Sequence, residues 1–448
     1  MKKFLLFVLA LGIGFSSFSQ TKHVLRSTKI PVMNVALEKA PEQSPRTIMA
    51  SEKPAAQTET INGIDATFIP IGKAGNAYGF YNSPRTYLWA DANLNSVVFT
   101  HRMQGGTELE GNSRVAYDLS TDGGATWTTD VQAYAPTGPG PTYPMDAGRY
   151  PQGGIINPEG NTDPANAYYA FYICTLDDSQ GSNWGGAAVG SNALTETDPP
   201  NASQINLTSS GDYYRYVPDA YTITQQGKAW NLQPSMDVSS GSPIYMGDLI
   251  IGPGEILDGE ITYDGDLMSF LAPNDGINDS KIAFAPDGQT GYILVMSDSE
   301  SDPQPYTSYH PILLKTTDGG DTWSDPNHVI LGSEDGISTV KNYWSDETME
   351  EVYGAGFNRD EIYYNMGYQT DLIIDSKGNP HITGIIALGT EDGWYPNEGT
   401  MATWHVYSDD GGSTWVADAL YDNIWLQGEP AGLVMYNRPY AASTMDGH

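Results

Sequence analysis

Short hydrophobic runs separated by glycine-rich turns dominate the chain from about Ile64 onwards, and no extended helical period of apolar residues stands out. Three of these runs are 115–119, 312–315 and 404–407, and a polar turn follows each at once. The composition agrees, because 49 Gly, 29 Pro, 29 Tyr and 10 Trp suit many short strands and tight turns better than long helices. The pattern therefore predicts an all-β protein.

The turns after these three runs share one eight-residue pattern: hydroxyl, any residue, Asp, Gly, Gly, any residue, Thr, Trp. They lie at 120–127, 316–323 and 408–415. The Asp can bond to nearby backbone groups in a tight turn, the glycines supply positive φ, and the Trp can anchor the returning strand by burying its ring. We expect each copy to be a structural hairpin turn, held by Asp122, Gly124, Trp127, Asp318, Gly320, Trp323, Asp410, Gly412 and Trp415.

The repeated pattern resembles the Asp box, also called the bacterial neuraminidase repeat, of the sialidase-like β-propeller superfamily. The resemblance covers about residue 65 to the end and implies four-stranded antiparallel blades, each with its box between the third and fourth strands. The segments 100–102, 149–153 and 160–164 also resemble secreted Asp-box proteins of the Bacteroidetes, which often end in a sorting domain.

A fainter repeat sets the number of blades. Turns between the first and second strands of a blade are expected near Asn93, Gly160, Gly227, Gly288, Gly378 and Gly447. The three Asp-box aspartates follow their own markers by 29, 30 and 32 residues, so the two signals share one phase. The spacing predicts a six-bladed β-propeller, or a seven-bladed one in a longer protein.

The same phase predicts three irregularities. Degenerate boxes are expected as turns at 185–194 and 252–259, and an acidic, aromatic insertion at about 331–368. The sequence ends at His448, one residue beyond the first turn expected for the sixth blade, so three strands of that blade would be missing. Either the N-terminal strands complete the blade or the sequence is a C-terminally truncated fragment, and we expect the fragment.

The N-terminal region has a different character. Residues 1–19 resemble a secretory signal peptide, with lysines at positions 2 and 3 and an apolar run that is too short to span a bilayer. Residues 20–62 are rich in Pro, Ala, Lys, Glu, Ser and Thr and are expected to form a flexible spacer, with 63–448 as the propeller. These features predict export through the Sec pathway, to the medium or the outer cell surface.

The net charge of −34 opposes binding to nucleic acid or to an anionic membrane. Cys174 is the only cysteine, so an intrachain disulfide is not possible, and it is expected to be a small buried strand residue. The histidines are scattered without the spacing of metal ligands, and no metal or cofactor is expected. The oxygen-rich segment 273–279 raises the question of a structural Ca²⁺ but lacks the pattern of an EF-hand loop.

Arginines mark one end of the expected channel. The first strand of each blade lines the channel, and propeller ligands usually bind where the first strands begin, on the face opposite the Asp boxes. Four arginines fall at the start of first strands, and blades four and five have Lys281 and Asp371 there instead; the arginines are Arg85, Arg149, Arg215 and Arg438. Such a cluster would select a carboxylate, sulfate or phosphate. In the alternative interpretation, these arginines pair with the surplus carboxylates and only join the blades.

The resemblance to sialidases implies an arginine triad that holds a substrate carboxylate, together with a Tyr nucleophile, its Glu partner and an Asp acid. The Phe/Tyr-Arg-Ile-Pro motif of that family is absent, and the catalytic groups cannot be assigned by motif. Tyr150, Asp146 and Asp219 are candidates near the mouth of the channel, as are Glu108 and Glu110. Two functions stay open: a non-catalytic module that binds a glycan or a protein through an arginine-lined anion site, and an exo-glycosidase of sialidase type acting on acidic sugars.

Overall fold

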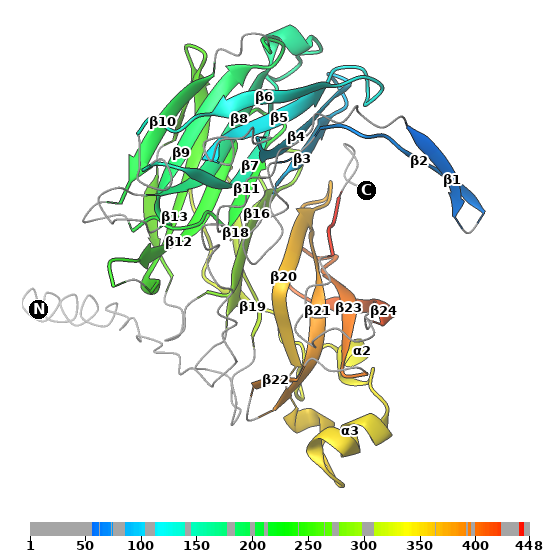
Figure 1. Cartoon of the computed structure of the whole chain (residues 1–448). Helices are drawn as coiled ribbons and strands as arrows, with labels where there is room; N and C mark the ends of the chain where they lie inside the picture. The colour runs from blue at the N-terminus through cyan, green and yellow to red at the C-terminus, as the bar shows by residue number, and fades with distance from the viewer. Residues whose placement is uncertain are drawn as a thin grey trace, which may run out of the picture.

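The computed structural model is built almost entirely of antiparallel sheets that follow one another along the chain (Figure 1). It describes residues 56–61, 63–72, 74, 86–103, 113–138, 145–176, 184–197, 202–209, 214–240, 242–263, 265–270, 277–297, 309–362, 364–390, 393–395, 399–422 and 439–442. Five sheets have four strands in consecutive pairing, and two of these five carry one further short strand. The predicted fold, an all-β propeller of four-stranded antiparallel blades, is confirmed.

Each blade pairs its strands in chain order. Blade one consists of β3 (Leu88–Asp91), β4 (Ser96–Arg102), β5 (Val115–Ser120) and β6 (Thr128–Tyr134). Blade two consists of β7 (Gly148–Ile156), β8 (Tyr168–Leu176), β9 (Trp184–Ala193) and β10 (Ser203–Thr208). Blade three consists of β11 (Ala220–Ile223), β12 (Ala229–Asp237), β13 (Ile244–Leu257) and β14 (Glu260–Tyr263), with β15 (Asp266–Ser269) also paired to β13.

Blade four consists of β16 (Asp279–Phe284), β17 (Gly291–Ser297), β18 (His310–Thr316) and β19 (Asn327–His328). Blade five consists of β20 (Tyr364–Ile374), β21 (Pro380–Thr390), β23 (Met401–Tyr407) and β24 (Val416–Asp422), with β22 (Gly393–Tyr395) paired to β21. Of the expected sixth blade, only residues 439–442 are described, and the marker turn at Gly447 lies outside the described residues.

The turns between first and second strands lie where the sequence repeat placed them in all five blades. Gly160, Gly227, Gly288 and Gly378 have φ values of 73°, 79°, 66° and 81°, which explains the glycine at each of these turns. In blade one, the left-handed residue is Asn95, with a φ of 49°, rather than the marker Asn93.

The two segments expected as degenerate boxes, 185–194 and 252–259, consist mostly of strand, with turn residues only at their C-terminal ends. In blade two, β9 runs through Trp184–Ala193, so the turn follows the glycine-bearing segment instead of occupying it. In blade three, β13 continues to Leu257, and the turn is Asp258-Gly259 with φ values of 53° and 88°. A two-residue Asp-Gly loop of this kind is favoured between antiparallel strands, because its twist matches theirs.

Each Asp box is a hydrogen-bonded turn around its aspartate. In the first box, Asp122 accepts bonds from the Ser120 hydroxyl (2.8 Å), the Thr126 amide (2.8 Å) and the Thr126 hydroxyl (2.6 Å). The same three bonds recur at Asp318 and Asp410. The Gly123 amide also donates to the carbonyl of Asn95 (2.8 Å), so the box lies beside the turn after the first strand. This places the boxes on the face away from the starts of the first strands.

We expect the Asp boxes to make the fold sensitive to acid. Hydrogen bonds from the threonine and the first hydroxyl lower the pKa of Asp122, Asp318 and Asp410 to about 2. A lowered folded-state pKa contributes stability above the unfolded-state value near 4, and that stability is lost as the pH falls towards 2. The Tm measured from pH 5 to pH 2 should fall less steeply when all three aspartates are changed to Asn. An equally steep fall in that triple variant would contradict the prediction.

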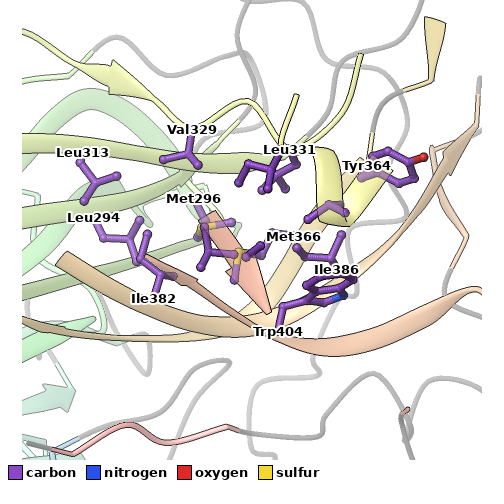
Figure 2. Packing of buried hydrophobic residues seen from close by; sticks show 14 of the residues in the cluster. Leu294, Met296, Leu313, Val329, Leu331, Tyr364, Met366, Ile382, Ile386 and Trp404 are labelled. Atoms are coloured by element: carbon purple, nitrogen blue, oxygen red, sulfur yellow. The ribbon is translucent and has the colours of Figure 1, made fainter. Parts of the chain in front are cut away.

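Apolar side chains fill the interfaces between neighbouring blades. Between blades four and five, the cluster includes Leu294, Met296, Ile386 and Trp404, and Figure 2 shows these side chains packed between strands. Separate clusters join blades one and two, two and three, and three and four. The sheets therefore pack face to face in the order of the chain, which brings their first strands side by side.

The predicted insertion is a small helical unit between blades four and five. It contains α2 (Ser338–Lys341), α3 (Asp346–Tyr353) and a short 3-10 turn (Arg359–Glu361); α2 lies beside β24, and α3 lies below blade five in Figure 1. Its buried side chains join the core between blades four and five, and they include Val340, Trp344 and Met349.

Before blade one, β1 (Gln57–Ile61) and β2 (Ile64–Phe68) form a two-stranded hairpin that projects from the sheets (Figure 1). The hairpin begins inside the segment expected as a spacer, and the remainder of 1–55 lies outside the described residues. Among the described helices, none is both long enough and apolar enough to cross a membrane.

Candidate functional site

A belt of polar side chains crosses the first strands of blades one to five. Residues just before or within β3, β7, β11, β16 and β20 bond from one blade to the next, although the blades are 60 to 90 residues apart in sequence. We call this set the inner belt; it consists of Thr86, Gln152, Asp219, Asp279, Ser280, Lys281, Thr370 and Asp371.

In blades one to three, the belt is made of neutral groups. The Thr86 amide donates to the Gln152 side-chain oxygen (3.3 Å), and the Gln152 amide group donates to the carbonyl of Pro218 (3.3 Å). The Thr86 hydroxyl reaches the carbonyl of Tyr221 in blade three (2.6 Å). Gly153 lets β7 lie close to β4 and β8, because a Cβ there would be 2.5 Å from the Tyr169 hydroxyl and 2.8 Å from the Thr100 hydroxyl.

In blades three to five, the belt is charged. The Ser280 hydroxyl donates to Asp219 (3.1 Å), which joins blades three and four. The buried Asp279 carboxylate accepts bonds from the Lys281 ammonium (2.8 Å) and from the amide and hydroxyl of Thr370 (3.1 and 2.8 Å), which joins blades four and five. Asp279 is 0% exposed, so its charge is balanced by Lys281 and not by water.

The belt continues beyond blade five. The amide of Ala441 donates to Asp371 (2.9 Å), so residues 439–442 lie next to β20, where the first strand of a sixth blade is expected. Burial raises the pKa of Asp371 to about 6, against the hydrogen bond from Ala441 and the charge of Lys281. A carboxyl group with this pKa can donate a proton near neutral pH.

Two of the four predicted arginines are described: Arg149 contacts residues of its own blade two, and Arg215 joins blade three to blade two. Arg149 is 2% exposed; its guanidinium donates to the carbonyl of Gly148 (2.8 Å) and lies 5.5 Å from the centre of the Trp184 ring. The partly exposed Arg215 donates to the Tyr172 hydroxyl of blade two (2.8 Å). Arg85, Arg438, Glu108 and Glu110 lie outside the described residues, so the convergence of the four arginines stays a prediction.

The backbone is irregular where Arg149 meets Tyr150. The pairing of β7 with β8 shifts register between Arg149 and Gln152, and Tyr150 has a φ of 50°, which is uncommon for a bulky residue. Tyr150 is buried with its ring 5.8 Å from that of Trp184, in an edge-on contact. At this bulge, the Arg149 guanidinium packs on the ring of Trp184. The regular alternation of side chains along a strand could not predict this orientation.

Asp146 and Asp219 have structural bonds. Asp146 accepts from the amide and hydroxyl of Thr137 (2.8 Å each), from the amide of Gly138 and from the side chain of Asn206. Burial of the Asp146 carboxyl tends to raise its pKa, but these hydrogen bonds have the larger combined effect and lower it. A carboxyl group with a lowered pKa is ionised at neutral pH and is therefore unsuitable as a proton donor. Asp219 belongs to the inner belt through Ser280.

The sequence missed the pairing of Asp279 with Thr370. The one hint of this pairing in the sequence was that Lys281 and Asp371 occupy the positions at which the other blades have arginines. The described residues contain no group of three or more His, Cys, Asp or Glu placed to hold a metal ion, and part of the oxygen-rich segment, 273–276, lies outside them.

The sequence matches no protein-family model and no curated protein. Among solved structures, it is similar to a polysaccharide lyase (11% identity, TM-score 0.41, 77% of this chain and 75% of the other). It is also similar to a GH43 endo-arabinanase from Bacillus licheniformis (13%, 0.33, 75% and 100%) and to a Hadza microbial sialidase (12%, 0.37, 75% and 58%). The fold assignment rests on the strand order of the blades themselves, and on that ground the chain is a β-propeller.

Proposed function

We propose that this protein is an exported β-propeller that binds a carbohydrate where its first strands begin, as a binding module rather than as an enzyme. The observation that carries the proposal is Arg215, a partly exposed residue before β11 whose guanidinium donates to the Tyr172 hydroxyl. The Tyr172 hydroxyl also accepts a bond from the side chain of Gln233 (2.6 Å), so its position is fixed from two sides.

The chemistry of this site suits an acidic sugar. A guanidinium group held in place can bind a carboxylate or sulfate through two parallel hydrogen bonds. Asp219 and Asp371 are partly exposed as residues, and their carboxyl oxygens are acceptors for sugar hydroxyls elsewhere on the inner belt. The signal-like N-terminus supports a ligand outside the cell, and the other predicted arginines, Arg85 and Arg438, would extend the site.

Arg215→Ala is expected to weaken binding of sialyllactose about 10- to 100-fold, because a charge-assisted hydrogen bond contributes roughly 1.5–3 kcal/mol. Arg215→Lys should restore only part of the affinity, since lysine lacks the planar fork. Calorimetry on the secreted protein measures both. The matched control is Lys377→Ala, which removes the same charge from an exposed turn on the Asp-box face. Equal losses in the two Ala variants, or no loss at Arg215, would contradict the proposal.

A glycoside hydrolase is the second candidate function, and it is favoured by one observation, the raised pKa of Asp371. A carboxyl of this kind could protonate a leaving oxygen. The protein used for calorimetry is also assayed on a fluorogenic sialoside. Turnover that Asp371→Asn abolishes would favour the hydrolase, whereas binding without turnover would favour the module.

A further inference from the structure

Blade one has one sheet face that points away from blade two. Val98, Val115 and Tyr117 point towards blade two, where they join its core. Side chains alternate along a strand, so Phe99, His101 and Asp118 lie on the opposite face. We call this opposite face the closing face.

A buried histidine and a buried aspartate meet on the closing face. His101 Nε2 lies 3.1 Å from Asp118 Oδ1, and the two side chains are 4% and 1% exposed. His101 Nδ1 lies 2.9 Å from the carbonyl oxygen of Arg102. Both ring nitrogens therefore face an oxygen that can only accept, which requires a proton on each nitrogen. This geometry fits an imidazolium cation and does not fit a neutral ring.

The surrounding charges agree with a doubly protonated ring. Burial alone would lower the pKa of His101, but the hydrogen bond and charge of Asp118, the Arg102 carbonyl and the charge of Asp130 raise it above its ordinary value near 6.5. Arg114 is also on this face, where its guanidinium donates to Gln132 (3.0 Å). The described segment before blade one, residues 69–72, carries no titratable side chain.

Gly72 lies directly against the pair. A Cβ at this position would overlap the Asp118 carboxylate, so only glycine lets the chain lie this close. Asp118 Oδ1 also accepts a bond from the Asp130 amide (2.7 Å), whereas Oδ2 has no hydrogen-bond partner in the described chain. Of the two hydrogen bonds described for Asp118, the one from His101 is the one whose donor can carry a positive charge.

We propose that the His101–Asp118 pair is a pH-sensitive latch that holds the segment around Gly72 on the closing face and releases it when His101 loses its second proton. Loss of that proton leaves one ring nitrogen as a lone pair facing an oxygen, and leaves Asp118 as a buried charge without its cation. Because the pKa of His101 is raised in the folded protein, the stabilisation is full below about 6.5 and is lost as the pH rises through the folded-state value.

Hydrogen exchange measured by mass spectrometry tests the latch on the whole secreted protein. After correction for intrinsic rates, exchange in the peptide covering 64–72 should be at least about 10-fold faster at pH 9 than at pH 6. A tenfold change in the opening equilibrium corresponds to about 1.4 kcal/mol, and burying a charge without its partner costs more than that. In His101→Gln, a neutral side chain replaces the cation, so exchange in this peptide should be fast and equal at both pH values. A peptide from α3 serves as the internal control, and its corrected rate should not change.

Nitrogen NMR of the histidine rings provides a second test that needs no variant. Both nitrogens of His101 should be protonated at pH 6, and the loss of one proton should coincide with the rise in exchange at 64–72. A neutral His101 ring at pH 6, or exchange at 64–72 that is the same at pH 6 and pH 9 in the unaltered protein, would overturn the proposal.

Discussion

Asp279→Ala is expected to lower the free energy of unfolding by about 3–5 kcal/mol, the range for removing one partner of a buried ion pair. The substitution leaves the Lys281 ammonium, itself only 8% exposed, without its carboxylate at 2.8 Å. It also removes the acceptor for the amide and hydroxyl of Thr370, so the inner belt is interrupted between blades four and five. Urea unfolding of the purified protein measures the loss.

Two further variants separate the buried charge from other effects. Asp279→Ala combined with Lys281→Met removes both charges, and it should recover at least half of the lost stability because the ammonium no longer stays buried after its carboxylate at 2.8 Å is removed. Asp325→Ala removes an exposed carboxylate from the same blade and should change the unfolding free energy by less than about 0.5 kcal/mol. A loss of under about 1 kcal/mol for Asp279→Ala would show that water or another group compensates Lys281.

The Asp boxes could be predicted from sequence because every bond of Asp122 is made within four residues of it. A second, fainter repeat in phase with the boxes located the first turns of the blades, where positive φ requires glycine at positions such as Gly288. The segments of the degenerate boxes consist mostly of strand because, without the Asp bonds, the length of the strand is determined by its pairing. Local chemistry therefore determined the part of the fold that could be predicted.

The inner belt could not be predicted, because its bonds join residues far apart in sequence. Asp279 and Thr370 are 91 residues apart, and Asp219 and Ser280 are 61 apart. The position of an arginine near the start of a first strand also did not predict how exposed its side chain is. Arg149 lies near the beginning of β7, but the bulge at Tyr150 accompanies a buried guanidinium that packs against Trp184. Arg215, without such a bulge, is partly exposed.

His101 shows a similar limit. The sequence marked it only as part of a segment similar to other Asp-box proteins. Its protonation follows from two acceptors, Asp118 and the Arg102 carbonyl, that converge on one ring when β4 pairs with β5. A charge state of this kind depends on the register of two strands and is not visible in the order of residues.

Trp404→Ala should destabilise the protein by about 3–5 kcal/mol, the usual range for a buried tryptophan. Trp404 on β23 is 1% exposed, and Figure 2 shows its ring beside Ile386 in the cluster between blades four and five. The Tyr343 ring of the insertion packs edge-on against it, with centroids 4.9 Å apart. The substitution therefore removes core volume in blade five and also one of the contacts that hold the insertion there, beside hydrogen bonds such as that from the Thr339 hydroxyl to the carbonyl of Ala417.

The effect should reach the helices of the insertion, because their buried side chains belong to the same core cluster as Trp404. In Trp404→Ala, hydrogen exchange across α2 and α3 should rise at least about 10-fold while strands of blade two keep their protection. Trp404→Phe is the matched control: it keeps an aromatic ring, and it removes no hydrogen bond, since the Trp404 Nε1 has no partner in the described chain. That variant should lose less than half as much stability. Unchanged exchange in α3 with a full loss of stability would show that the insertion is held by contacts other than Trp404.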